Sequence, residues 1–111
     1  MSKILVPPSQ EEVDYEFSPY NPNGAKIIIK RYKEDVLNLF QYSIHIFEQY
    51  GNHQMFLKKS PIRKRIYLAA ALVTAGLLEE REPISGNCIF SLTEKGFEQR
   101  DKLVKAGLID G

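Results

Sequence analysis

Five positively charged side chains lie within eight residues and form the densest group in this sequence that could do chemistry: Lys58, Lys59, Arg63, Lys64 and Arg65. Such a cluster attracts phosphate groups, most strongly where a helix begins, because the helix dipole adds to the attraction. The alternative is a solvated basic surface without a ligand, which describes most runs of like charge. The helix predicted to follow these residues favours phosphate contact.

The charge of the whole chain hides this local excess. The 111 residues carry a formal net charge of +1, but residues 25–76 hold nine Lys and Arg against three Asp and Glu. The flanking ranges 1–24 and 77–111 are both net negative. A positive middle between acidic ends predicts a localised anion-binding surface rather than a generally basic protein.

The other reactive side chains do not form a catalytic or metal-binding pattern. Three carboxylates cluster without a nucleophile or a histidine beside them: Glu79, Glu80 and Glu82. His45 and His53 have no Cys or carboxylate at metal-ligand spacing, so structural or surface roles are expected for both. The single cysteine, Cys88, is expected to be a small buried hydrophobe. We therefore expect no enzyme, no metal and no cofactor.

A helix is predicted immediately after the first cations. Ser60 is a good N-cap, Pro61 suits the first helical position, and Gly76 supplies the stop, so the helix is expected over 60–75. At 100° per residue its predicted core face comprises Ile62, Ile66, Ala69, Leu72 and Val73. Its predicted outward face comprises Arg63, Tyr67, Ala70 or Ala71, and Thr74, with Lys64 beside them. Small and donor-bearing residues on that face suit close approach to a nucleic-acid groove.

Three further elements are expected in the domain. A helix over 33–50 is predicted from an apolar stripe that ends at Gly51: Val36, Leu37, Phe40, Ile44, Phe47 and Tyr50. A two-stranded ribbon is expected over 77–92, with turn residues at 83–87. Thr93 caps a final helix over 94–106, with Phe97, Leu103 and Val104 as its apolar contacts. Such a terminal helix often serves dimerisation, and Leu108 and Ile109 could extend that contact.

Three stretches have less definite predictions. Residues 1–24 contain four prolines, which argue against a helix, and an extended acidic arm is expected there. Ile27–Ile29 suits either a short strand or the lead-in to a helix. Residues 52–59 suit equally a short helix, a brief strand or a loop.

Two motifs resemble the winged helix-turn-helix regulators of the MarR and PadR type. The first is Leu72-Val73-Thr74-Ala75-Gly76-Leu77-Leu78-Glu79-Glu80, and the second is Phe90-Ser91-Leu92-Thr93-Glu94-Lys95-Gly96. In those families a recognition helix ends in such a glycine before the wing, and the second wing strand leads into a Leu-Thr-x-x-Gly helix start. The resemblance covers about a third of the chain and concerns the superfamily.

The resemblance implies that Ser60–Ala75 is the recognition helix and that 82–87 form the wing tip. By position, the residues expected to face a groove or phosphates are Arg63, Lys64, Tyr67 and Thr74. The sequence departs from the pattern in two places: the interval before the recognition helix is short, and the wing is acidic. An acidic wing is poorly suited to a phosphate backbone.

These observations predict an α+β fold, a small winged helix-turn-helix domain with three or four helices and a two- or three-stranded ribbon. Residues 1–24 would be an arm and residues 25–111 the domain. The expected function is binding of double-stranded DNA by a cytoplasmic homodimer, in transcription regulation or as an accessory factor for plasmid or viral DNA. The expected DNA contacts are Lys58, Lys59, Ser60, Arg63, Lys64, Arg65, Tyr67 and Thr74. The alternative is a winged-helix module for protein–protein interaction. No apolar run approaches the roughly 20 residues of a membrane span, so no membrane contact is expected.

Overall fold

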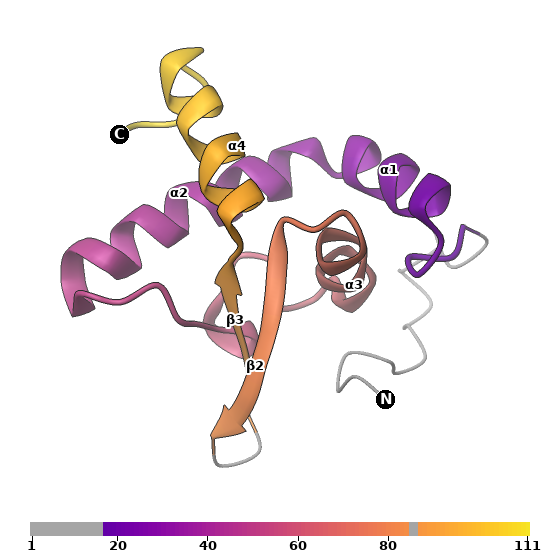
Figure 1. Cartoon of the computed structure of the whole chain (residues 1–111), viewed down its shortest axis with the longest axis horizontal. Helices are drawn as coiled ribbons and strands as arrows, with labels where there is room; N and C mark the ends of the chain where they lie inside the picture. The colour runs from indigo at the N-terminus through magenta and orange to yellow at the C-terminus, as the bar shows by residue number, and fades with distance from the viewer. Residues whose placement is uncertain (1–16, 85–86) are drawn as a thin grey trace.

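The computed structural model describes residues 17–84 and 87–111, with the side chains of 82–84 also left out. Along the chain the elements are α1 (Pro22–Arg31), α2 (Lys33–Tyr50), β1 (Met55–Phe56), the 3₁₀ helix η2 (Leu57–Lys59), α3 (Ile66–Thr74), β2 (Leu78–Ile84), β3 (Asn87–Leu92) and α4 (Glu94–Lys105). The described part is therefore an α+β domain with four α-helices and one antiparallel sheet (Figure 1). Most of the predicted arm, residues 1–16, lies outside the described residues.

The sheet has three strands in the order β1-β3-β2. Leu78 of β2 pairs with Leu92 of β3, and Met55 of β1 pairs with Phe90 on the other side of β3. The predicted ribbon over 77–92 is confirmed as the pair β2–β3, which extends away from the helices (Figure 1). The brief strand considered for 52–59 is β1. The α+β class is confirmed, and the arrangement is consistent with a winged helix without identifying one.

Helix α1 begins at Pro22, within the range 1–24 for which an extended arm was predicted. Asn21 caps it, because its Oδ1 accepts hydrogen bonds from the backbone N–H of Asn23 at 2.9 Å and of Gly24 at 3.4 Å. Pro22 occupies the first turn, where a proline is tolerated. The prediction that the prolines exclude a helix throughout 1–24 is therefore wrong at its end. Ile27–Ile29 lie within α1, so the helix alternative is correct.

The helix over 33–50 is confirmed as α2, and Gly51 ends it with φ +71°. Its buried residues are Val36, Leu39, Phe40, Ser43 and Ile46. The predicted core stripe is wrong at its C-terminal end, where Phe47 is 47% and Tyr50 is 63% exposed. Apolar residues occur on more than one face of α2, and the domain covers only part of its length.

Helix α3 begins at Ile66 and not at Ser60 or Pro61. The backbone N–H of Arg63 donates to the carbonyl of Ser60 at 3.2 Å, and that of Arg65 to the carbonyl of Ile62 at 2.9 Å. These bonds span three residues, so this stretch forms turns instead of the predicted first turns of an α-helix. The predicted end is confirmed. Gly76 has φ +80°, and the N–H of Leu77 donates to the carbonyl of Leu72 at 3.0 Å, as in a Schellman cap.

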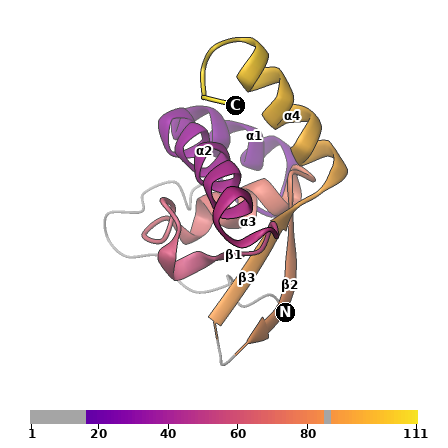
Figure 2. The same cartoon turned by 90° about the vertical axis from the view of Figure 1, so that its left-hand side faces the viewer.

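The middle of helix α3 is buried on every side. Five consecutive residues are at most 1% exposed: Leu68, Ala69, Ala70, Ala71 and Leu72. The assignment of Ala70 or Ala71 to an outward, groove-facing surface is therefore wrong. Helix α1 packs on α3, with Ala25 and Ile28 of α1 fully buried (Figure 2). The alanines of α3 permit this close packing, because their side chains end at Cβ.

The predicted terminal helix is confirmed as α4. The Thr93 hydroxyl accepts a hydrogen bond from the N–H of Gly96 at 3.0 Å, and Phe97, Leu103 and Val104 pack against the core. After α4 the chain turns back at Gly107, and Ile109 is only 8% exposed. Ile109 therefore belongs to the core of its own chain and is not available for a subunit contact. Leu108 is 49% exposed.

An aromatic stack joins α2 to α4. The His53 ring lies 4.4 Å from the Phe47 ring, nearly parallel to it, and 4.7 Å from the Phe97 ring, edge to face. The Arg100 guanidinium lies over the Phe97 ring, 4.9 Å from its centroid. Burial, followed by the charge of Arg100, lowers the pKa of His53 below its usual 6.5. The folded structure therefore favours the neutral imidazole of His53.

The His53 stack predicts a dependence of stability on pH. Because the folded-state pKa of His53 is lowered, the unfolded chain binds the proton more readily. The free energy of unfolding should therefore fall as pH drops through the usual histidine value of 6.5 toward the folded-state pKa. Urea titrations at several pH values measure this slope, and His53→Phe should flatten it. An equal slope in both proteins would contradict the prediction.

Gly96 provides a second test of the packing. A Cβ at this position would collide with the carbonyl oxygen of Leu77, which is backbone and cannot yield as a flexible side chain would. We expect Gly96→Ala to lower the free energy of unfolding by about 2 kcal/mol, after the gain in helix propensity is included. Gly51→Asn is the control, because open space surrounds Gly51 and Asn tolerates its conformation. Equal stability of Gly96→Ala and wild type in urea denaturation would contradict this packing.

Candidate nucleic-acid interface

Residues 58–65, called the basic segment below, connect β1 to α3 through η2 and the turns that follow it. Ser60 ends η2, with its hydroxyl donating to the carbonyl of Leu57 at 2.8 Å and its N–H donating to the same oxygen at 3.1 Å. Ser60 and Ile62 are each 2% exposed and anchor the segment to the domain. Ser60 was predicted to contact DNA, but the structure buries it and uses its hydroxyl within the fold.

Four of the five cations in the basic segment are exposed: Lys58, Lys59, Arg63 and Lys64. Lys59 Nζ lies 5.6 Å from the centroid of the Phe56 ring, and Arg63 Nη1 is 3.4 Å from the carbonyl oxygen of Ser60. None of the four forms an ion pair with a carboxylate in residues 17–84 or 87–111. The structure therefore leaves four positive charges on one short, anchored segment facing solvent.

The fifth cation, Arg65, has a different role. Its Nε donates to Asp35 Oδ2 at 2.8 Å, and its guanidinium lies 4.3 Å from the centroid of the Tyr32 ring. Tyr32 is the junction between α1 and α2, and Asp35 lies in the first turn of α2. Arg65 therefore fixes the start of α3 against this junction. Its charge is neutralised, so it adds little to an anion-binding surface.

Tyr67 and Thr74 lie on α3, outside the basic segment. Both are only partly exposed, and seven residues of helix separate them by about 10 Å. Burial raises the pKa of Tyr20, and the charges of the neighbouring Tyr67 and Glu80 raise it further. Tyr20 thus lies near both Tyr67 and Glu80 of β2, and the Glu80 carboxylate would repel a phosphate placed beside Tyr20.

The strand order separates the positive charges of the basic segment from the negative charges of β2. The basic segment continues from β1, while the acidic strand β2 forms the opposite edge of the sheet, beyond β3. Glu79 of β2 accepts hydrogen bonds from Arg81 at 3.2 Å and from the Ser91 hydroxyl at 3.3 Å. Of the predicted wing tip, 82–87, residues 85 and 86 and the side chains of 82–84 lie outside the described part of the chain. Acidic side chains of the described ribbon therefore do not neutralise the basic segment.

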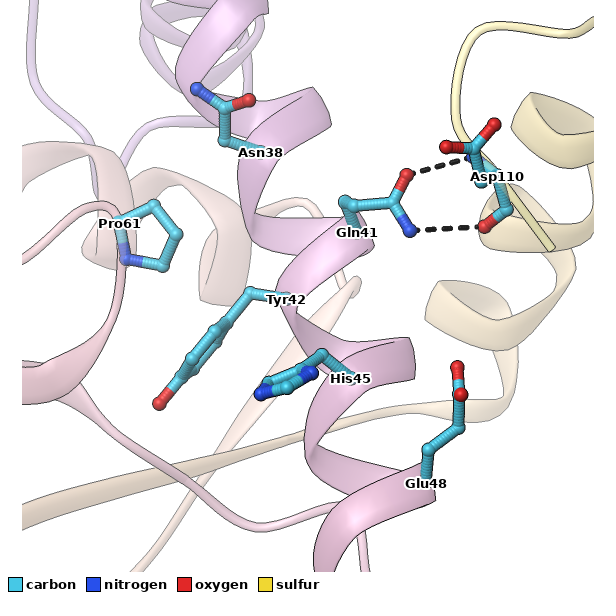
Figure 3. A pocket seen from close by; sticks show the side chains of 7 residues that line it. All are labelled: Asn38, Gln41, Tyr42, His45, Glu48, Pro61 and Asp110. Atoms are coloured by element: carbon cyan, nitrogen blue, oxygen red, sulfur yellow. Dashed lines mark hydrogen bonds between the residues drawn. The ribbon is translucent and has the colours of Figure 1, made fainter.

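An open groove of about 610 Å³ adjoins the basic segment (Figure 3). Its lining residues come from α2, the basic segment and the C-terminal residues: Asn38, Gln41, Tyr42, His45, Glu48, Pro61 and Asp110. Gln41 holds the C-terminal residues in place, with Nε2 donating to the Asp110 carbonyl at 3.0 Å and Oε1 accepting from its N–H at 2.7 Å. A signal was present in the sequence, because Asn38, Tyr42 and His45 recur at helical spacing.

The described residues offer little else that could do chemistry. Among them, no three His, Cys, Asp or Glu side chains gather closely enough to hold a metal ion. In the same residues, no helix combines the length and apolar character that crossing a membrane requires. Cys88, expected to be buried, is partly buried and packs against the core.

Comparison of the chain with protein-family models, with curated proteins and with solved structures finds no match. The site must therefore be interpreted from its own geometry.

Arg65 is ion-paired and Arg63 is exposed, so their removal should have different effects on stability. Arg65→Ala removes a partly buried ion pair and the contact with Tyr32, so the free energy of unfolding should fall by about 1–2 kcal/mol. Arg63→Ala is the matched control, because Arg63 is exposed and its loss should change stability by no more than about 0.5 kcal/mol. Urea denaturation of both variants measures the difference. Equal losses would contradict the structural role of Arg65.

Proposed function

We propose that this chain binds double-stranded DNA through the basic segment. The observation that supports the proposal is the presence of four exposed cations, Lys58, Lys59, Arg63 and Lys64, on a segment anchored by two buried residues. Cations on an anchored backbone lose less conformational freedom when they bind than cations on a mobile chain. Lysine and arginine side chains of this kind contact the phosphate backbone.

The proposed contact differs from the groove insertion that the sequence favoured. Helix α3 is covered by α1 and cannot enter a groove along its length, so the turns before α3 must make the contact. The order of α2, β1, η2, α3, β2 and β3 supports a winged-helix relationship, with η2 and the turns in place of a second helix. Tyr67 and Thr74 would stand beside the DNA at most.

Contacts that reach only phosphate give affinity without much sequence preference. This favours a DNA-handling accessory role over a regulator that reads base edges through α3. We retain the homodimer as part of the proposal, since a second copy would double the number of cations on one duplex. Measurement of the subunit number in solution tests this part separately.

DNA binding measured across salt concentration tests the proposal. Four phosphate contacts predict that the logarithm of the binding constant falls by about 3–4 for each tenfold rise in salt. The double variant Lys58→Ala/Lys59→Ala should reduce this slope by about 2 and weaken binding to all sequences alike.

The matched control is Lys102→Ala/Lys105→Ala, which removes the same charge from exposed positions of α4. The control should keep a slope close to that of wild type. Absence of binding at low salt, or equal slopes in the two double variants, would rule out the basic segment as the DNA contact.

The second candidate is a protein-interaction module. It is favoured by the exposed aromatic rings Phe47 and Tyr50 at the end of α2, since exposed aromatic side chains often anchor protein partners. Heparin chromatography discriminates between the two functions. Retention at moderate salt that is lost in Lys58→Ala/Lys59→Ala supports nucleic-acid binding, whereas weak retention together with a monomeric size supports the protein module.

A further inference from the structure

The groove beside the basic segment has an aromatic floor. Tyr42 and His45 project from the same face of α2 into it, and Pro61 lies across from them on the basic segment (Figure 3). Aromatic rings stack on nucleobases of every type, because every base has a flat π-face. A proline ring opposite them offers a second apolar surface. The groove is therefore lined by two aromatic rings on one side and by a proline ring on the other.

The polar groups of the groove suit the edges of a base. Asn38 presents an amide, which both donates and accepts, and Glu48 and Asp110 present carboxylates that accept. Burial raises the pKa of Tyr42, with a further contribution from Tyr50, so its hydroxyl keeps its proton and can donate. Gln41 is already engaged by the main chain of Asp110. The free groups can therefore meet both the donors and the acceptors of a base edge.

The charges around the groove determine how a nucleotide would lie. The carboxylates of Glu48 and Asp110 repel phosphate, whereas Pro61 stands between Lys59 and Arg63 in the chain. A sugar-phosphate backbone is therefore directed to the Pro61 side, and the base to the α2 side. This polarity distinguishes the groove from a site for a free anion, for which the carboxylates would be unfavourable.

We propose that this groove receives one unpaired nucleobase of the DNA whose phosphates are held by the basic segment. The inference rests on the proposed function and makes its ligand more specific. In an intact duplex both faces of a base are covered by its neighbours, so only a base at an overhang, gap or mismatch can stack on Tyr42 and His45 without first being extruded. DNA with an unpaired base beside a duplex is therefore the preferred ligand.

The test compares a blunt DNA hairpin with the same hairpin carrying a short single-stranded overhang that contains 2-aminopurine. Wild type should bind the overhang form more tightly, by about 5- to 150-fold for one stacked base, and should quench the 2-aminopurine fluorescence. Tyr42→Leu keeps the apolar bulk and should remove both the preference and the quenching, while its affinity for the blunt hairpin stays unchanged.

His45→Ala gives a second test that does not depend on a partly buried residue, because His45 is exposed. It should lower the preference for the overhang several-fold, and Gln49→Ala, on an exposed position of α2 outside the groove lining, should not. Lys58→Ala/Lys59→Ala should weaken binding to both hairpins equally, which separates phosphate contact from base contact.

Equal affinity for the two hairpins, or quenching that persists in both Tyr42→Leu and His45→Ala, would overturn the inference and leave DNA binding by the basic segment intact. In that case a polar peptide becomes the better candidate for the groove. Absence of binding to either hairpin at low salt would overturn the proposed function, and the inference with it.

Discussion

The burial of the middle of α3 on every side is the constraint on which the rest of the structure depends. A nine-residue helix with five consecutive residues at most 1% exposed has no polar face of its own, so other elements must cover it all round. Helix α1 supplies one cover, and the alanines of α3 allow the close approach. Arg65 then ties the start of α3 to the α1–α2 junction through Asp35 and Tyr32. Any surface that binds a partner must consequently lie outside the middle of α3.

The basic segment meets that requirement because it forms turns that precede α3 in the chain. Its two buried residues, Ser60 and Ile62, hold the chain to the domain, and the charged residues around them face outward. Charge is thereby concentrated without a long helix to carry it. Strand order completes the separation, since β3 lies between β1, which leads into the basic segment, and the acidic strand β2.

The signals that identified helix ends in the sequence were local, and they were reliable for that reason. Gly51, Gly76 and Gly107 all adopt positive φ, and Thr93 caps α4, because each conformation is decided within a few residues. Ser60-Pro61 is an equally good local signal for a helix start, yet it failed. Ser60 instead ends η2, and α3 begins only after Arg65, whose partner Asp35 is distant in the chain. No local pattern contains that contact.

The faces of the helices were harder to predict than their positions. Alanine suits a buried and an exposed site alike, so Ala70 and Ala71 carried no information about α1, which covers them. Phe47 and Tyr50 continue the apolar stripe of α2, yet both are exposed, and the contact of Phe47 with the His53 ring depends on tertiary structure. Tertiary contacts also decide which of the predicted DNA contacts are exposed and which have structural roles. The four exposed cations follow from charge and chain position, whereas the loss of Ser60 and Arg65 to structural roles follows from tertiary contacts.

The groove on α2 has carboxylates at one end and the basic segment at the other. The two hydrogen bonds between Gln41 and Asp110 bring a carboxylate to one end of the groove, and Pro61 brings the basic segment to the other. A gradient of charge therefore runs across a surface whose floor is aromatic (Figure 3). A nucleotide has the same division, with an anionic backbone on one side and a flat, hydrogen-bonding ring on the other. A carboxylate or a simple phosphate has the anionic part but no flat ring. An apolar ligand would leave the amide and the carboxylates of the groove without partners. The complete groove is therefore matched best by a nucleotide.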